Sequence, residues 1–158
     1  MTSRSSNKNQ SLKHILVLHG PNLNLLGERQ PEIYGAMTLT ELNQKLTLFA
    51  SQNNCELRIH QSNSEGTLID LLHEHRKLVD GIILNPGAYT HYSYAIRDAV
   101  ASISIPTIEV HLSDIHQREA FRKISVIAPV CIKQISGLGL QSYIQAIELL
   151  LWRELQKG

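Results

Sequence analysis

The 158-residue length is typical of one domain. The 15 basic and 14 acidic residues give a net charge of +1 without a basic run, which excludes the electrostatic pattern of a nucleic-acid-binding protein. The sequence contains no run of about 18 apolar residues, so it predicts no membrane span. Its two cysteines, Cys55 and Cys131, are too few for a disulfide framework. We expect a cytoplasmic protein with a disordered polar tail at residues 1–13 and a single catalytic domain at residues 14–158.

Strand and helix patterns alternate along the first half of this domain. An apolar run at residues 14–19 predicts a buried strand. Thr38 and Glu41 have the spacing of a capping box, which predicts the start of a helix. Alternating residues at 55–60 predict a second strand, and helical spacing at residues 68–75 predicts a second helix.

The same alternation continues in the second half. Residues 81–84 and 106–111 predict the third and fourth strands, with a helix over residues 95–100 between them. For the fifth strand, residues 126–128 compete with residues 130–135. We favour the later segment because the two glycines that follow it then open a last helix.

Apolar strands that alternate with helices indicate a parallel sheet covered on both faces. Five strands predict an α/β flavodoxin-like sheet in the order 2-1-3-4-5, with helices on both faces. In such sheets a ligand binds at the carboxyl ends of the strands where the order reverses, here the first and third strands. The loop over residues 20–35 follows the first strand and is much longer than the usual ~4–6 residues.

Several polar side chains are expected to converge at this edge of the sheet. They are Asn22, Arg29, Tyr34, Asn85, His91, Glu109, His111 and Ser113. Glu109 and His111 share one strand face because residues i and i+2 point to the same side, so they form a candidate acid–base pair. Ser113 or Asp114 is also expected to cap a short helix that runs through Arg122. The sequence shows no nucleophile elbow, no phosphate-binding Walker loop and no metal-ligand spacing.

Six sequence blocks carry these residues in a fixed order. They are GPNLNLLG at 20–27, RQPEIYG at 29–35, QSNSEG at 61–66, NPGAYTH at 85–91, IEVHLS at 108–113 and REAFR at 118–122. Together they resemble the blocks of type II 3-dehydroquinate dehydratase, and the similarity runs from about His14 to Trp152. Any one block would be a weak signal, but six in order at the right separations are a strong one.

The resemblance implies a lyase of the shikimate pathway of aromatic amino-acid biosynthesis. This enzyme dehydrates 3-dehydroquinate to 3-dehydroshikimate by anti elimination through an enol or enolate, with no cofactor, no metal and no lysine imine. By resemblance, Tyr34 is the base that removes the proton next to the ketone, and Arg29 lowers the pKa of Tyr34. Asn22 holds the water that stabilises the enolate, His111 protonates the departing hydroxyl, and Glu109 orients His111.

The resemblance also implies binding positions and an assembly. The implied substrate-binding residues are Asn85, His91, Leu112, Ser113 and Arg122, together with Asp98, which reaches the site of a neighbouring subunit. The family assembles twelve subunits as four trimers, so a homododecamer is expected. Neither a nucleic-acid partner nor a membrane partner is implied.

Two other classes of function compete with this enzyme. A flavodoxin-like signalling module would need acidic residues after the first strand, where this chain has His19 and Gly20, and a flavin site would need a compact, hydroxyl-rich phosphate loop. An assembly protein that kept the fold but lost the reaction is the second alternative. The intact pairs Arg29–Tyr34 and Glu109–His111 favour an active enzyme.

Overall fold

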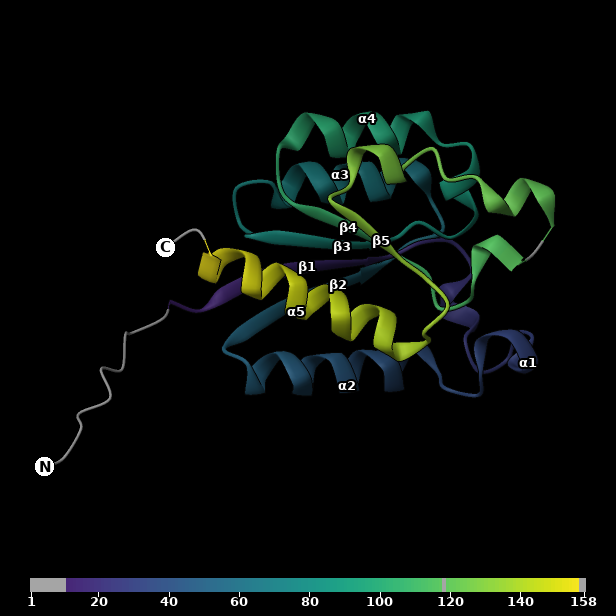
Figure 1. The fold of residues 1–158 in the computed structure, drawn as a ribbon, viewed down its shortest axis with the longest axis horizontal. Coiled ribbons are helices and arrows are strands. Elements are labelled where there is room, and N and C mark those ends of the chain that lie inside the picture. The colour runs from purple at the N-terminus through teal and green to yellow at the C-terminus, as the bar shows by residue number, and fades with distance from the viewer. Residues whose placement is uncertain (1–10, 118, 157–158) are drawn as a thin grey trace, which may run out of the picture.

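Figure 1 shows the computed structural model, which describes residues 11–117 and 119–156. Five parallel strands form one sheet in the order β2-β1-β3-β4-β5. They are β1 (Lys13–His19), β2 (Cys55–Gln61), β3 (Gly81–Asn85), β4 (Thr107–Val110) and β5 (Lys133–Ile135). The predicted flavodoxin-like sheet and its strand order are confirmed. Most of the expected tail, residues 1–10, lies outside the described residues, and Lys13 already belongs to β1.

Helices cover both faces of the sheet (Figure 1). One face carries α2 (Leu39–Gln52) and α5 (Leu140–Gln156), and the other carries α3 (Glu65–His75) and α4 (Tyr94–Ile103). The short helix α1 (Pro31–Tyr34) lies in the long loop after β1. In the ranges that the structure describes, no helix is long and apolar enough to cross a membrane.

Alternate residues of β1 build two separate hydrophobic cores. Ile15 and Val17 pack in the core beneath α2 and α5, whereas Leu16 and Leu18 pack in the core beneath α3 and α4. Successive side chains of a strand point to opposite faces, so both sets are buried. This arrangement explains why the strands read as continuous apolar runs, and each buried side chain contributes about 1.5–3 kcal/mol of transfer free energy.

The capping box predicted for the first long helix is confirmed. Thr38 Oγ1 accepts a hydrogen bond from the backbone N–H of Glu41 at 3.2 Å, and Glu41 Oε2 accepts one from the N–H of Thr38 at 3.1 Å. These two bonds satisfy donors that would otherwise lack a partner at the helix start. They also fix the point at which the long loop after β1 ends.

The segment after β4 differs from the prediction. The expected single short helix is replaced by two 3-10 segments, η3 (Ile115–Gln117) and η4 (Ala120–Lys123), with residue 118 outside the described part of the chain. Asp114 begins the first turn, because its Oδ1 accepts the backbone N–H of His116 at 2.9 Å. Such local side-chain bonds favour turns over continuous helix.

The later of the two segments proposed for the fifth strand forms β5. It is shorter than predicted, because residues 128–130 form the 3-10 segment η5 (Ala128–Val130), which includes the end of the competing segment and the start of the favoured one. Ser125 Oγ accepts the backbone N–H groups of Ile127 at 3.2 Å and Ala128 at 2.9 Å. These two donors are therefore bonded to a local side chain rather than to a neighbouring strand.

Candidate active site

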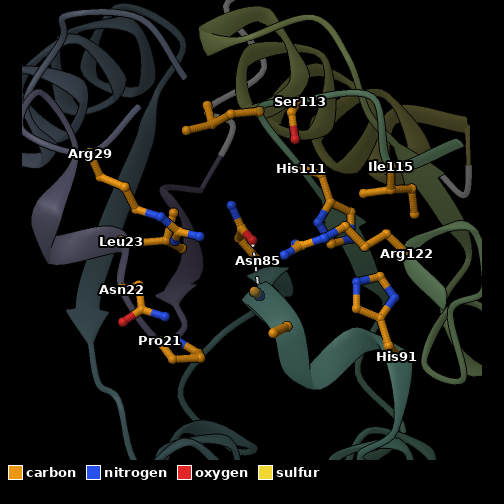
Figure 2. A pocket seen from close by; sticks show the side chains of 13 residues that line it. Pro21, Asn22, Leu23, Arg29, Asn85, His91, His111, Ser113, Ile115 and Arg122 are labelled. Carbon is orange, nitrogen blue, oxygen red and sulfur yellow. Dashed lines mark hydrogen bonds between the residues drawn. The ribbon is translucent and has the colours of Figure 1, made fainter. Parts of the chain in front are cut away.

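A cavity of about 210 Å³ lies at the carboxyl ends of β1, β3 and β4. Its lining is formed by Pro21, Asn22, Leu23, Arg29, Asn85, Gly87, Ala88, His91, His111, Leu112, Ser113, Ile115 and Arg122. Figure 2 shows Asn85 near the centre, with Asn22 and Arg29 on one side and His111 and Arg122 on the other. The position agrees with the edge where the order of the strands reverses.

The structure brings most of the predicted site residues to this cavity and places Glu109 and Asp98 outside its lining. Glu109 lies buried behind the lining on β4. Asp98 lies exposed on α4 and does not line the cavity. Tyr34 is the last residue of α1, and its side chain lies outside the described parts of the structure.

The loops after β1 and β3 touch through their backbones. Gly20 N donates a hydrogen bond to Asn85 O at 2.7 Å, and a Cβ atom at Gly20 would lie 2.7 Å from the carbonyl carbon of Pro86. Gly87 has a φ of +58°, and a Cβ there would lie 3.1 Å from Pro21 O. Only glycine fits such a close approach without a backbone shift. The two loops therefore form one floor for the cavity.

Asn22 is held in an unusual backbone conformation by the loop after β2. Its φ of 69° is in the left-handed region, which asparagine tolerates better than most residues. The N–H of Asn22 donates to Asn63 Oδ1 at 3.0 Å, and Gln61 Nε2 donates to the same oxygen at 3.1 Å. Gln61 Nε2 also lies 3.2 Å from Gly20 O. Residues of the QSNSEG block thus position the start of the loop after β1.

Glu109 on β4 and His111, the residue directly after this strand, form the predicted pair. His111 Nε2 lies 3.3 Å from Glu109 Oε1, and the carboxylate is fully buried. Hydroxyls of Thr90 and Ser125 donate to Oε1, the latter at 2.7 Å, and Gln134 Nε2 donates to Oε2 at 2.5 Å.

Burial alone would raise the pKa of Glu109, because a low-dielectric environment disfavours the charged form. The His111 ring 3.3 Å away, together with hydrogen bonds from Thr90 and Ser125, outweighs burial and lowers the pKa below its usual range. Glu109 is therefore a buried anion that faces the His111 ring, an arrangement that can orient an imidazole acid.

Arginine and histidine side chains line the same cavity. Arg122 stacks its guanidinium over Phe121, 5.0 Å from the ring centroid, and its Nε lies 3.7 Å from Glu119 Oε1. His91 donates Nδ1–H to Ile124 O at 2.8 Å, which fixes the ring orientation. With Arg29 also in the lining, the cavity suits a small ligand that carries a carboxylate. No cluster of three metal-ligating side chains occurs within 11–117 and 119–156.

Sequence reasoning missed two groups of polar residues behind the lining, of which His19, Thr90 and Tyr143 are buried. Thr90, Ser125 and Gln134 surround Glu109, and His19, Asn43 and Tyr143 connect to Asn85. One signal was present in the sequence, because His19 and Asn85 each end a buried apolar strand. The other residues come from helices, loops and the strand β5, and their contact with the site depends on the tertiary fold.

The fold and cavity define a flavodoxin-like α/β protein with a small-molecule site at the carboxyl edge of its sheet. Residues 13–151 match the sequence profile of the family described as Dehydroquinase class II. The chain is 61% identical over 136 residues to the 3-dehydroquinate dehydratase of Bacillus licheniformis, covering 86% of this chain and 94% of that protein. It is 54% identical over 140 residues to that of Bacillus subtilis, covering 89% and 95%.

Solved structures agree with the sequence relatives. The type II dehydroquinase of Butyrivibrio crossotus superposes with a TM-score of 0.86 at 51% identity, covering 87% of this chain and 97% of that one. The type II dehydroquinase of Propionibacterium acnes gives a TM-score of 0.86 at 37% identity, covering 90% and 98%. The chain belongs to the class II dehydroquinase family, as the six sequence blocks predicted.

Proposed function

We propose that this chain dehydrates 3-dehydroquinate to 3-dehydroshikimate by anti elimination through an enol or enolate. The observation that carries the proposal is the convergence of Asn22, Arg29, Asn85 and His111 on one cavity, with the buried anion Glu109 behind His111. The relatives named 3-dehydroquinate dehydratase support the same substrate for this chain. Such an enzyme of aromatic amino-acid biosynthesis is expected in the cytoplasm.

Tyr34 is the proposed base that removes the proton next to the ketone. A free tyrosine has a pKa of about 10, so only about 0.1% is ionised at pH 7. Arg29 lines the cavity five residues before Tyr34, and its charge would favour the phenolate and lower the pKa of Tyr34. Gln30 and Gly35 flank α1 with φ values of 39° and 80°. We propose that the loop segment that carries α1 acts as a lid that closes over substrate and excludes water.

His111 is the proposed acid that protonates the departing hydroxyl. Glu109 would stabilise the protonated ring and fix its orientation across the 3.3 Å contact. In Figure 2, Arg29 and His111 lie on opposite sides of Asn85. A base carried beside Arg29 and an acid at His111 would therefore act on opposite faces of a ring held between them, which is the requirement for anti elimination.

The remaining lining residues would hold the substrate. Asn22 is proposed to hold the water that stabilises the developing enolate oxygen, an electrostatic role that strengthens in a water-excluded site. The proposed contacts to the carboxylate and hydroxyls of the substrate come from Asn85, His91, Leu112, Ser113 and Arg122. Asp98 is proposed to reach the site of a neighbouring subunit in a homododecamer of four trimers, because it lies exposed on α4 and away from its own cavity.

The test is ultraviolet absorbance of purified protein mixed with 3-dehydroquinate, since the product contains a conjugated enone. We expect the wild type and Tyr94→Phe, which alters an exposed tyrosine, to form the enone band at similar rates. Tyr34→Phe should lower kcat by at least about 10²-fold, the usual contribution of a general base. Chelator and borohydride added with substrate should leave the rate unchanged. A folded wild-type protein that forms no enone would contradict the proposed function, and an active Tyr34→Phe variant would remove Tyr34 from it.

A further inference from the structure

A chain of hydrogen-bonded polar side chains runs through the core from α2 to the cavity. Asn43 Oδ1 lies 2.8 Å from His19 Nε2, and His19 Nδ1 lies 3.0 Å from the hydroxyl of Tyr143. That hydroxyl accepts a hydrogen bond from Asn85 Nδ2 at 3.0 Å. His19 and Tyr143 are fully buried, and Asn85 is 3% exposed. Four elements, α2, β1, α5 and β3, thus meet at the back of one cavity residue.

The groups at the two ends of this hydrogen-bonded series decide which atom donates and which accepts in every bond of the series. The oxygen of Asn43 can only accept, so His19 carries its proton on Nε2 and leaves a lone pair on Nδ1. Tyr143 therefore donates its O–H to His19 and accepts from Asn85. Asn85 Oδ1 accepts the N–H of Gly87 at 3.2 Å, a bond that is drawn in Figure 2. Both ends of the Asn85 amide are fixed, and one N–H of its Nδ2 is left for the cavity.

This hydrogen-bonded series cannot move a proton to the site. Burial lowers the pKa of His19 to about 4 despite its hydrogen bond with Asn43, and burial raises the pKa of Tyr143 despite its bond with Asn85. Both groups are therefore neutral near pH 7. An amide at each end has no proton to give at this pH. The hydrogen-bonded series instead fixes the orientation of Asn85.

We propose that Tyr143, held by His19, is a positioning residue that fixes the Asn85 amide so that it presents an N–H donor to an oxygen of the substrate. This inference rests on the proposed function. Without the Tyr143 hydroxyl, Asn85 Nδ2 would lose its buried acceptor and the amide could rotate. A donor held in one orientation loses less freedom when it binds an oxygen than one that must first be ordered.

A double-mutant cycle separates positioning from a purely structural role. Tyr143→Phe keeps the ring and removes only the hydroxyl, and we expect kcat/KM for 3-dehydroquinate to fall about tenfold, the size of one lost buried hydrogen bond. In an Asn85→Ala background the same change should alter kcat/KM by less than about twofold, because Tyr143 then has no amide to orient. An equal loss in both backgrounds would contradict the inference.

Ser142→Ala is the matched control on the same helix. Ser142 is fully buried, its hydroxyl accepts the N–H of Leu138 at 3.2 Å, and it does not line the cavity. It should lower thermal stability but keep kcat/KM within about twofold, so a tenfold loss there would mean that any buried hydroxyl has this effect.

A second pair of variants tests His19 itself. His19→Asn retains an amide oxygen that can accept the Tyr143 O–H, and it should keep more activity than His19→Leu, which has no acceptor. Equal activities of these two folded variants would contradict the role of His19. A wild type without turnover would contradict the proposed function and this inference together. An active wild type with a fully active Tyr143→Phe variant would contradict this inference alone.

Discussion

At the residue scale, His19 shows how burial changes one side chain. Its pKa is lowered to about 4 in the folded protein, from 6.5 for an unperturbed histidine. Between these two pH values His19 binds more protons in the unfolded chain than in the folded chain. Stability therefore falls as the pH drops from about 6.5 to about 4, and this single group accounts for about 3 kcal/mol of the loss.

Urea unfolding at several pH values between 7.5 and 4 measures this effect. We expect His19→Asn to be less stable than the wild type at pH 7.5 but to lose about 3 kcal/mol less on acidification. The matched control is His73→Asn, which makes the same substitution at an exposed histidine of α3. Parallel pH profiles for the wild type and His19→Asn would show that His19 is not a source of acid lability.

The pairing of Glu109 with His111 could be predicted because a strand places residues i and i+2 on one face. The hydrogen-bond partners of Glu109 could not be predicted from the sequence. Thr90 comes from η2 (Gly87–His91), Ser125 from the segment after η4, and Gln134 from β5. No local spacing relates these elements. Roles that depend on substrate, above all that of Tyr34, remain predictions.

At the element scale, the cavity depends on backbone contact between the loops after β1 and β3. A methyl group at Gly20 would lie 2.7 Å from the carbonyl carbon of Pro86 and 2.8 Å from Asn85 O, both backbone atoms that cannot rotate away. We expect Gly20→Ala to lower the free energy of unfolding by about 1–3 kcal/mol. It should also lower kcat/KM, because Asn22 and Asn85 would be displaced. Chemical denaturation and initial rates measure the two effects.

Gly66→Ala is the control for this variant. Gly66 lies in the first turn of α3, and a Cβ there would meet only Ser64 Oγ, at 3.9 Å. Alanine is favoured over glycine in a helix by about 1 kcal/mol, so stability should be unchanged or higher and activity unchanged. A Gly20→Ala variant as stable and active as Gly66→Ala would mean that the two loops are not in close contact.

Hydrophobic pattern predicted the five strands and the main helices because each element buries an apolar face. The capping box at Thr38 added one accurate boundary. The structure of the segment after β4 was predicted wrongly, as one short helix, for a physical reason. η3 and η4 are short turns, and Asp114 and His116 bond locally there, so no apolar period marks them.

At the scale of the whole molecule, Asp98 tests whether sites are shared between subunits. It is exposed on α4 and does not line the cavity of its own subunit. We expect the wild type to have a native mass about twelve times the 17.8 kDa of one chain. Asp98→Ala and Tyr34→Phe should each be impaired alone. Coexpression of the two variants should restore activity, because some hybrid sites would combine an intact Tyr34 with an intact Asp98 from a neighbour.

Native mass spectrometry and initial rates of the coexpressed proteins check this prediction. The control is coexpression of Asp98→Ala with the wild-type-like variant Tyr94→Phe, which gives the activity expected from simple dilution. If the hybrid of the two impaired variants stays as inactive as its parents while assembly is intact, Asp98 is a surface charge and the sites are not shared.

In the proposed reaction a base and an acid act from opposite faces of one substrate ring. The most direct measurement uses 3-dehydroquinate with deuterium on one face of the carbon between the ketone and the carbon that bears the departing hydroxyl. We predict that deuterium opposite the departing hydroxyl is lost from the product and that deuterium on the same face is retained, as the product mass would show. Loss of the label from the same face as the hydroxyl would contradict anti elimination and the assignment of His111 and Tyr34 to opposite sides of the cavity.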